Sequence, residues 1–280
     1  MVRIVSDTST LYSSHQAQEA GFDVTPLFVT IAGNSYLEFD EISPQDFVKI
    51  IYEGNMPVSS QPAVGSVAQV YDKYPNDDIL NISMADGLSG TYNGAVAASQ
   101  LSENEERITV LNSRTLCGPH RYMVEVAKKM AAAGSTVSQI LEKMEELMAS
   151  SKSYLMPADF DYLRRGGRLS PLVSFVGATA GLVPVMTLNE DCTRLVVATV
   201  RRGFAGAFKF VTKTVDKWGV GEGWRVYVTH ADALERAESA VKILKESIPN
   251  AIYEILPLSP AFITQGGPGC VAIQVIKDCD

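Results

Sequence analysis

The segment Ile79–Gln100, which reads ILNISMADGLSGTYNGAVAASQ, indicates the fold class of this chain. It begins with a short apolar run, Ile79–Ser83, of the kind that forms a buried parallel strand. Gly87 and Gly90 then free the backbone for a turn, and a helix is expected at about Tyr92–Gln100. A buried strand, a glycine-rich turn and a helix in this order are typical of an α/β fold.

The rest of the N-terminal half repeats this unit. Ser43 suits an N-cap, and Pro44 suits the first position of the helix that follows. Further strands are expected at Val2–Ser6, Val24–Ile31 and Ile108–Leu111, and further helices at Ser13–Ala20, Pro44–Tyr52, Val64–Tyr74, Tyr122–Ala133 and Val137–Ser150. Strands that alternate with helices predict a Rossmann-like parallel sheet with helices on both faces, in an N-terminal domain of residues 1–152.

The pattern changes after the polar stretch Ser150–Ser153. Strands are expected at Ser153–Pro157, Val183–Leu188, Thr193–Val200, Arg225–His230, Ala251–Leu256 and Val271–Val275, and helices at Asp161–Arg165, Val173–Ala180, Phe204–Trp218 and Ala233–Ser247. The residues Asn189–Asp191 suit the turn of a hairpin between two of these strands. This order predicts a C-terminal α+β domain with a mixed sheet at residues 153–280.

The composition argues against several classes of function. The chain has 280 residues and a formal net charge of −8, which would repel a nucleic-acid backbone. Its four cysteines are scattered rather than paired as CxxC, so a metal site is not expected. Apolar runs stay short of the roughly 18 residues that span a bilayer, and the N-terminus lacks the apolar region of a signal peptide. A cytoplasmic protein without an integral membrane segment is predicted.

Two turns in the N-terminal half place hydroxyl groups before helices. Ser89, Gly90 and Thr91 stand at the expected start of one helix, and Ser59 and Ser60 precede another. A helix N-terminus offers unpaired N–H groups and the positive end of the helix dipole, so hydroxyls placed there can help to bind a carboxylate or phosphate. The purely structural interpretation of the Ser89 turn is an N-cap serine with tight packing, and that of the Ser59 segment is a simple turn.

Two more turns lie in the C-terminal half. Gly166 and Gly167 permit a sharp turn beside Arg168, whose guanidinium is suited to hold a carboxylate or phosphate. Gln265 and Gly266 belong to a glycine-rich segment before the last strand. The structural interpretations are a helix C-cap for the first turn and a simple turn for the second.

Catalytic and nucleotide-binding motifs are incomplete in this sequence. Ser89 lacks the Gly-x-Ser-x-Gly register of a nucleophile elbow, and the three histidines, His15, His120 and His230, are distant from it along the chain. Neither a Gly-x-Gly-x-x-Gly after the first strand nor a Walker loop is present. We therefore expect no catalytic residue. A serine esterase or acyl hydrolase that uses Ser89 stays open as the alternative, because folding could bring a histidine close.

Taken in order, these segments resemble the DegV family of bacterial fatty-acid-binding proteins. The matching segments are Ile4–Ser9, Ser59–Pro62, Leu88–Tyr92, Gly166–Ser170, Thr229–Asp232 and Gly267–Gly269. The resemblance covers nearly the whole chain. It implies two domains with one long-chain fatty acid buried in a tunnel between them.

The resemblance also implies roles for single residues. The carboxylate would be held by the hydroxyls of Ser59 and Ser89, and Arg168 would lie near the head group. Some members carry the acyl group for a bacterial fatty acid kinase, whose separate catalytic subunit makes acyl-phosphate. This chain would then be a non-catalytic carrier that has a fatty acid as ligand and needs no cofactor. Candidates for the tunnel wall are Phe175, Val176, Ala180, Leu182 and Phe262.

The sequence departs from the family pattern at three places. Ser59 replaces a usual threonine and keeps the hydroxyl, and Asn112-Ser113 replaces a usual Asp-Ser. Gln265 stands where the family commonly has a histidine. Glutamine can donate a hydrogen bond, but it carries neither a positive charge nor a transferable proton. The resemblance therefore implies an altered head-group environment.

Overall fold

The computed structural model of the protein describes residues 1–169 and 181–279. The chain divides into two compact units. Unit 1 comprises Met1–Ala149 together with a short return segment, Ser259–Ala261. Unit 2 comprises Ser150–Leu258 and Phe262–Asp280.

Unit 1 is built on a four-stranded parallel sheet with the strand order β2-β1-β6-β7. The strands are β1 (Val2–Asp7), β2 (Asp23–Thr25), β6 (Asp78–Ser83) and β7 (Ile108–Asn112). Buried apolar side chains of β1 and β6 pack against the helices that follow β5 and β6, as shown by the cluster of Val5, Ile79, Val67 and Ala95. The parallel α/β sheet expected from the sequence is confirmed.

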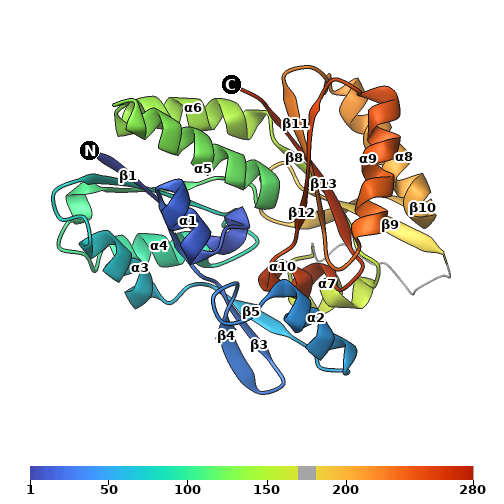
Figure 1. Cartoon of the computed structure of the whole chain (residues 1–280), viewed down its shortest axis with the longest axis horizontal. Coiled ribbons are helices and arrows are strands. Elements are labelled where there is room, and N and C mark those ends of the chain that lie inside the picture. The colour runs from blue at the N-terminus through green and yellow to red at the C-terminus, as the bar shows by residue number, and fades with distance from the viewer. Residues whose placement is uncertain (170–180, 280) are drawn as a thin grey trace. The chain divides into compact units, whose positions relative to one another are not determined.

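Unit 1 has six helices within the described residues, and helices lie on both sides of the parallel sheet. They are α1 (Ser14–Ala20), α2 (Pro44–Tyr52), α3 (Val64–Asp72), α4 (Thr91–Ser99), α5 (Cys117–Ala132) and α6 (Val137–Ala149), with 3-10 turns η1 (Thr8–Thr10) and η2 (Glu105–Arg107). Figure 1 shows α3 and α4 on one side of β1, and α5 and α6 on the other. Parallel sheets of α/β proteins are typically buried on both faces, and helices on the two sides provide this cover.

The predicted strand Val24–Ile31 is wrong, because the structure divides it in two. Pro26 has no backbone N–H to donate to a sheet, and β2 ends at Thr25 beside it. The remainder forms β3 (Phe28–Ile31), which belongs to a separate antiparallel sheet with the order β4-β3-β5. Its other strands are β4 (Asn34–Leu37) and β5 (Val58–Ser60), neither of which was predicted.

Unit 2 holds a mixed six-stranded sheet with the order β10-β9-β8-β13-β11-β12. The strands are β8 (Lys152–Met156), β9 (Leu182–Leu188), β10 (Leu195–Arg202), β11 (Trp224–His230), β12 (Ile252–Pro257) and β13 (Val271–Lys277). β11 and β12 pair in parallel, and the other neighbours are antiparallel. The predicted α+β character and the predicted β9–β10 hairpin are both confirmed.

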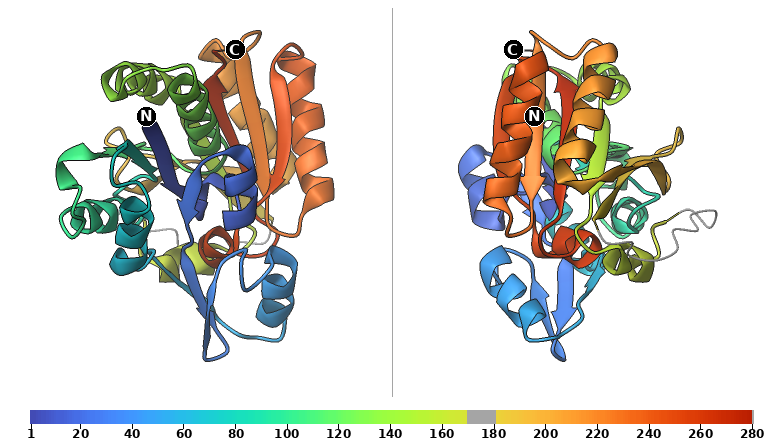
Figure 2. Two further views of the ribbon diagram at one scale, coloured as in Figure 1. Left: turned by 60° about the vertical axis from the view of Figure 1, so that its left-hand side comes forward. Right: turned by 90° about the vertical axis from the view of Figure 1, so that its right-hand side faces the viewer.

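Three helices of the described residues lie wholly in unit 2: α7 (Phe160–Gly166), α8 (Gly203–Lys217) and α9 (Leu234–Ser247). A fourth, α10 (Pro260–Gly266), begins in the return segment of unit 1 and continues in unit 2. Figure 2 shows α8 and α9 running along the sheet, and buried Phe208, Leu244 and Ile273 share one core between them. No helix was predicted at α10, which is short and ends in glycine. The expected helix Val173–Ala180 lies outside the described residues.

Candidate functional site

The hydroxyls of Ser59 and Ser60 lie on β5 rather than in the predicted turn. β5 pairs antiparallel with β3, so that Ser59 is opposite Val29 and Ser60 is opposite Phe28. Side chains alternate along a strand, and here Ser59 is half-buried whereas Ser60 is exposed. The N-cap position of α3 is taken by Ala63, whose methyl group cannot accept a hydrogen bond. These serines therefore do not cap α3, and the interpretation of Ser59 and Ser60 as a simple turn is wrong because they lie in a strand.

The second hydroxyl turn lies where β6 passes into α4. Ser89 Oγ is 2.7 Å from Thr91 Oγ1 and accepts a longer hydrogen bond from the Thr91 N–H at 3.3 Å. Gly90 occupies the N-cap position, and Thr91 is the first helical residue. The turn therefore gathers two hydroxyls and the first N–H groups of a nine-residue helix. That it binds an anion stays a prediction.

The side chain of Gln61 brings these two segments together. A Cβ atom added at Gly90 would lie 1.9 Å from Gln61 Oε1, and one added at Gly94 would lie 2.8 Å from Gln61 Nε2. The residue that directly follows β5 thus packs against the first turn of α4. Ser60 directly precedes Gln61 in the chain, and Ser89 directly precedes Gly90. The contact between Gln61 and Gly90 therefore brings both hydroxyl segments into one region of unit 1.

A buried polar network that the sequence analysis missed supports the same region. Asp7, at the carboxyl end of β1, accepts hydrogen bonds from the N–H groups of Ser9 at 2.9 Å and Met84 at 3.1 Å. Met84 directly follows β6 and begins the loop that leads to Ser89. The Asp7 carboxylate therefore anchors the start of that loop. The signal in the sequence was the run of four polar residues, Asp7–Thr10, directly after an apolar strand, and the structure shows that all four are buried.

The imidazole of His120 completes this network. Its Nδ1 is 2.7 Å from Ser9 Oγ, and its Nε2 is 2.9 Å from the Ile82 carbonyl and 3.2 Å from Ser6 Oγ. Burial lowers the pKa of His120. Both ring nitrogens are thus engaged inside unit 1, while the recorded hydroxyl partner of Ser89 is Thr91. His120 is therefore not placed to act as a base for Ser89.

Glu38 is the second buried carboxylate that the sequence analysis missed. It follows β4, is fully buried, and accepts hydrogen bonds from Thr8 Oγ1 and from the Ala261 N–H, the latter at 2.8 Å. Burial raises the pKa of Glu38 to about 7. This side chain ties the return segment Ser259–Ala261 into unit 1.

In unit 2 the structure brings Arg168 and Gln265 together at one glycine. Arg168 Nη1 donates to the Gly166 carbonyl, and a Cβ atom added at Gly166 would lie 1.9 Å from Gln265 Oε1. Burial, and next the neighbouring Arg194, lower the pKa of Arg168. Gly167 is the left-handed C-cap of α7, so the helix C-cap interpretation of that turn is confirmed.

Gly266 is a packing residue at the end of α10. A Cβ atom there would lie 2.5 Å from Cys270 Sγ. The predicted turn Gln265–Gly269 is wrong in its first part, because Gln265 and Gly266 close a helix. Of the tunnel candidates, Phe262 is half-buried and Leu182 is 41% exposed; Phe175, Val176 and Ala180 lie outside the described residues.

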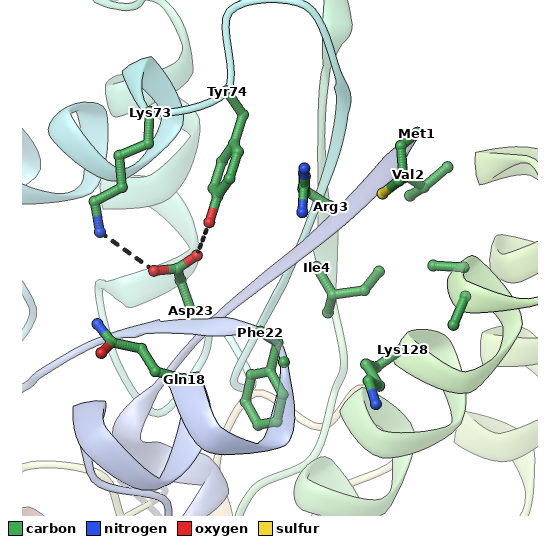
Figure 3. Close-up of a pocket in the computed structure, with 13 residues that line it drawn as sticks. Met1, Val2, Arg3, Ile4, Gln18, Phe22, Asp23, Lys73, Tyr74 and Lys128 are labelled. Carbon is green, nitrogen blue, oxygen red and sulfur yellow. Dashed lines mark hydrogen bonds and ion pairs between the residues drawn. The ribbon is translucent and has the colours of Figure 1, made fainter.

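A pocket of about 440 Å³ opens at the opposite, amino-terminal end of β1. Figure 3 shows Lys73 and Tyr74 directed toward Asp23, and the Asp23 carboxylate lies 3.2 Å from Lys73 Nζ and 2.5 Å from Tyr74 Oη. Ligands of open α/β sheets bind at the carboxyl ends of strands, where the Ser89 loop lies. The far pocket contains none of the predicted site residues.

Within residues 1–169 and 181–279, no group of three or more His, Cys, Asp and Glu side chains is arranged to hold a metal ion. Across the same part of the chain, every helix is too short or too polar to cross a bilayer.

The chain is similar to known proteins over nearly its whole length. Residues 1–278 match the model of a family described as "Uncharacterised protein, DegV family COG1307". A DegV domain-containing protein of Listeria monocytogenes is 27% identical over 277 residues, which cover 97% of each chain. The predicted resemblance is confirmed by these matches.

Two solved structures are also similar over almost their entire length. A fatty-acid-binding DegV family protein of Thermus thermophilus is 26% identical, with a TM-score of 0.88 and 99% of both chains covered. A DegV lipid-binding protein of Thermotoga maritima is 27% identical, with a TM-score of 0.86, covering 99% of this chain and 98% of its own. By family match, sequence and fold, the present chain belongs to the DegV family.

Proposed function

We propose that this protein binds a long-chain fatty acid and holds its carboxylate on the hydroxyls of Ser59 and Ser89. The observation that carries the proposal is the contact of Gln61 with Gly90 and Gly94, which brings the two hydroxyl segments into one region of unit 1. Ser60, Gly90 and Thr91 complete the proposed site. The relatives described as fatty-acid-binding and lipid-binding proteins support the choice of ligand.

The chemistry of this region suits a carboxylate. A carboxylate accepts hydrogen bonds only, and charge-assisted bonds from hydroxyl and N–H groups are stronger than bonds between neutral groups. The N-terminus of α4 adds the positive end of its dipole. The polar groups would orient the ligand, whereas the acyl chain would supply most of the affinity, at ~0.8 kcal/mol for each buried methylene.

We further propose that Arg168, Gln265 and Gly266 take part in binding the head group. The meeting of Arg168 and Gln265 at Gly166 supports a joint role for these two side chains. The acyl chain would occupy an apolar tunnel in residues 153–280. The protein would act as a cytoplasmic, non-catalytic carrier that presents the carboxylate to a separate kinase. Gln265 could donate a hydrogen bond there, but it could not transfer a proton.

Mass spectrometry of the purified protein tests the ligand. Denaturation should release a fatty acid in near-stoichiometric amount, and delipidated protein should take up added palmitate or oleate. An empty protein that takes up neither would contradict the proposal. A matched sample of an unrelated protein from the same host controls for carry-over of lipid.

A further inference from the structure

We propose that Gln61 is a positioning residue that sets the spacing of the two hydroxyl segments, and that Gly90 and Gly94 are glycines in order to admit its side chain. This inference rests on the proposed function, because it concerns the geometry of the same carboxylate site. The carboxylate itself would be bound by the hydroxyls, and Gln61 would act through them.

The backbone gives no reason for glycine at either position. Gly90 has φ −70° and ψ 0°, which any residue adopts, and Gly94 lies inside α4. Glycine weakens a helix interior because it loses more conformational freedom on folding than alanine does. Alanine would therefore favour α4 at Gly94, unless space were the limit.

At both glycines the terminal amide of Gln61 occupies the space that a Cβ atom would need. A Cβ atom at Gly90 would overlap Gln61 Oε1 at 1.9 Å and lie 3.1 Å from Gln61 Cδ. A Cβ atom at Gly94 would lie 2.8 Å from Gln61 Nε2 and 3.4 Å from Cδ. Residues four apart on a helix share one face, so the two glycines form a shallow seat for a single planar amide.

The seat joins the end of β5 to the start of α4. Gln61 is one residue beyond Ser60 at the end of β5, and Gly90 is one residue beyond Ser89 at the start of α4. The position of the Gln61 amide on the seat therefore fixes how far the end of β5 stands from the Ser89 turn. A carboxylate bound by hydroxyls from both segments is sensitive to that separation, because hydrogen bonds weaken steeply as their geometry degrades.

A double-mutant cycle tests the inference. Gly94→Ala should displace the Gln61 side chain and weaken hexadecanoic acid binding at least about tenfold, which corresponds to about 1.4 kcal/mol. Adding Gln61→Ala removes the overlap and should recover part of that loss. The control is Gly65→Ala in α3, where an added Cβ meets nothing within 4 Å; it should leave binding unchanged.

Hexadecan-1-ol separates positioning from general damage, since it has the same chain without a carboxylate. The variants should lose affinity for the acid while keeping most of their affinity for the alcohol. Equal losses for acid and alcohol, or purely additive effects of the two substitutions, would overturn the inference. If Gly94→Ala does not fold, Gln61→Ala alone must still reduce the preference for acid over alcohol, and an unchanged preference would overturn it.

The same experiment distinguishes failure of the inference from failure of the proposed function. If the wild type binds neither ligand, the proposed function fails. The seat is then judged from urea unfolding, in which Gly94→Ala must destabilise the wild type more than it destabilises the Gln61→Ala protein. Equal destabilisation in both backgrounds would overturn the seat as well.

Discussion

The carboxylate of Glu38 accepts a hydrogen bond from the backbone N–H of Ala261, which lies 223 positions further along the chain. Thr8 donates to the other oxygen, Ser259 contacts the same carboxyl group, and Asp7 is the charged neighbour. Burial outweighs these hydrogen bonds and raises the pKa of Glu38 to about 7. A single side chain thus holds a distant segment in place, and its burial there disfavours the ionised form of its carboxyl group.

We expect this carboxyl group to make the stability of the protein pH-dependent. The unfolded chain releases the Glu38 proton near pH 4.5, whereas the folded protein retains it to about pH 7. The unfolded state therefore binds fewer protons between these values, and the free energy of unfolding falls as the pH rises through this window. The contribution of Glu38 should be on the order of 1–3 kcal/mol.

Glu38→Gln should remove that contribution, because an amide can keep both hydrogen bonds if the Thr8 hydroxyl rotates. Urea unfolding from pH 4.5 to 8 should give a flatter profile for the variant than for the wild type. Glu53→Gln, at an exposed position, is the matched control and should follow the wild type. Parallel profiles for Glu38→Gln and wild type would show that another group carries the pH dependence.

The carboxylate site predicts a loss of affinity when both hydroxyls are removed. Ser59→Ala combined with Ser89→Ala should weaken fatty-acid binding by about 1–3 kcal/mol, since charge-assisted hydrogen bonds are lost. Competition with a fluorescent fatty acid measures the change. Ser138→Ala, on the exposed side of α6, should bind as the wild type does. Unchanged affinity in the double variant would place the carboxylate elsewhere.

Gln265→His should give the proposed site a titratable group. Protonated imidazole can pair with a bound carboxylate, so affinity should rise as the pH falls from about 8 to about 6, by at most about tenfold per pH unit. The wild type, with a neutral amide, should stay flat over this range. Gln139→His, exposed on α6, controls for the added histidine. A flat profile in Gln265→His would mean that this position does not face the ligand.

Gly267→Ala should destabilise the protein more than Gly33→Ala does. Both glycines have a left-handed backbone, with φ +74° and φ +79°, which costs an alanine about 1–2 kcal/mol. A Cβ at Gly33 meets nothing within 4 Å, whereas one at Gly267 would lie 2.7 Å from the Tyr162 ring. Urea unfolding should show a further loss of at least about 1 kcal/mol at Gly267. Equal losses would mean that the ring moves aside freely.

Local pattern was sufficient to predict most of the fold. The short apolar strands β1, β6 and β7, and the capped helix that begins at Pro44, follow from sequence neighbours alone. The antiparallel sheet of β3, β4 and β5 could not be predicted in this way. Its strands are short, and the Ser59 segment becomes a strand only through pairing with β3.

The candidate site was predicted as separate turns, but not as an assembly. Arg168 and Gln265 meet at Gly166 although almost a hundred residues separate them, and spacing carries no information about such a contact. Glu38 likewise looked like an ordinary acidic residue in a polar loop. One signal was available and went unused: a glycine inside the helical sequence at Gly94 indicates close approach of another group.

The return segment Ser259–Ala261 also bears on how the protein is made. A ribosome completes residues 1–149 long before it adds Ala261, so newly synthesised unit 1 lacks the segment Ser259–Ala261 until late in synthesis. Domains of nascent chains generally fold from the N-terminus as they emerge. Here the Glu38 carboxyl group lacks its backbone donor until synthesis is nearly finished, and a chain that stops before Ser259 never acquires it. Completion of unit 1 is therefore a late, whole-chain event, and a fragment cut at Ala149 is an unfinished version of it.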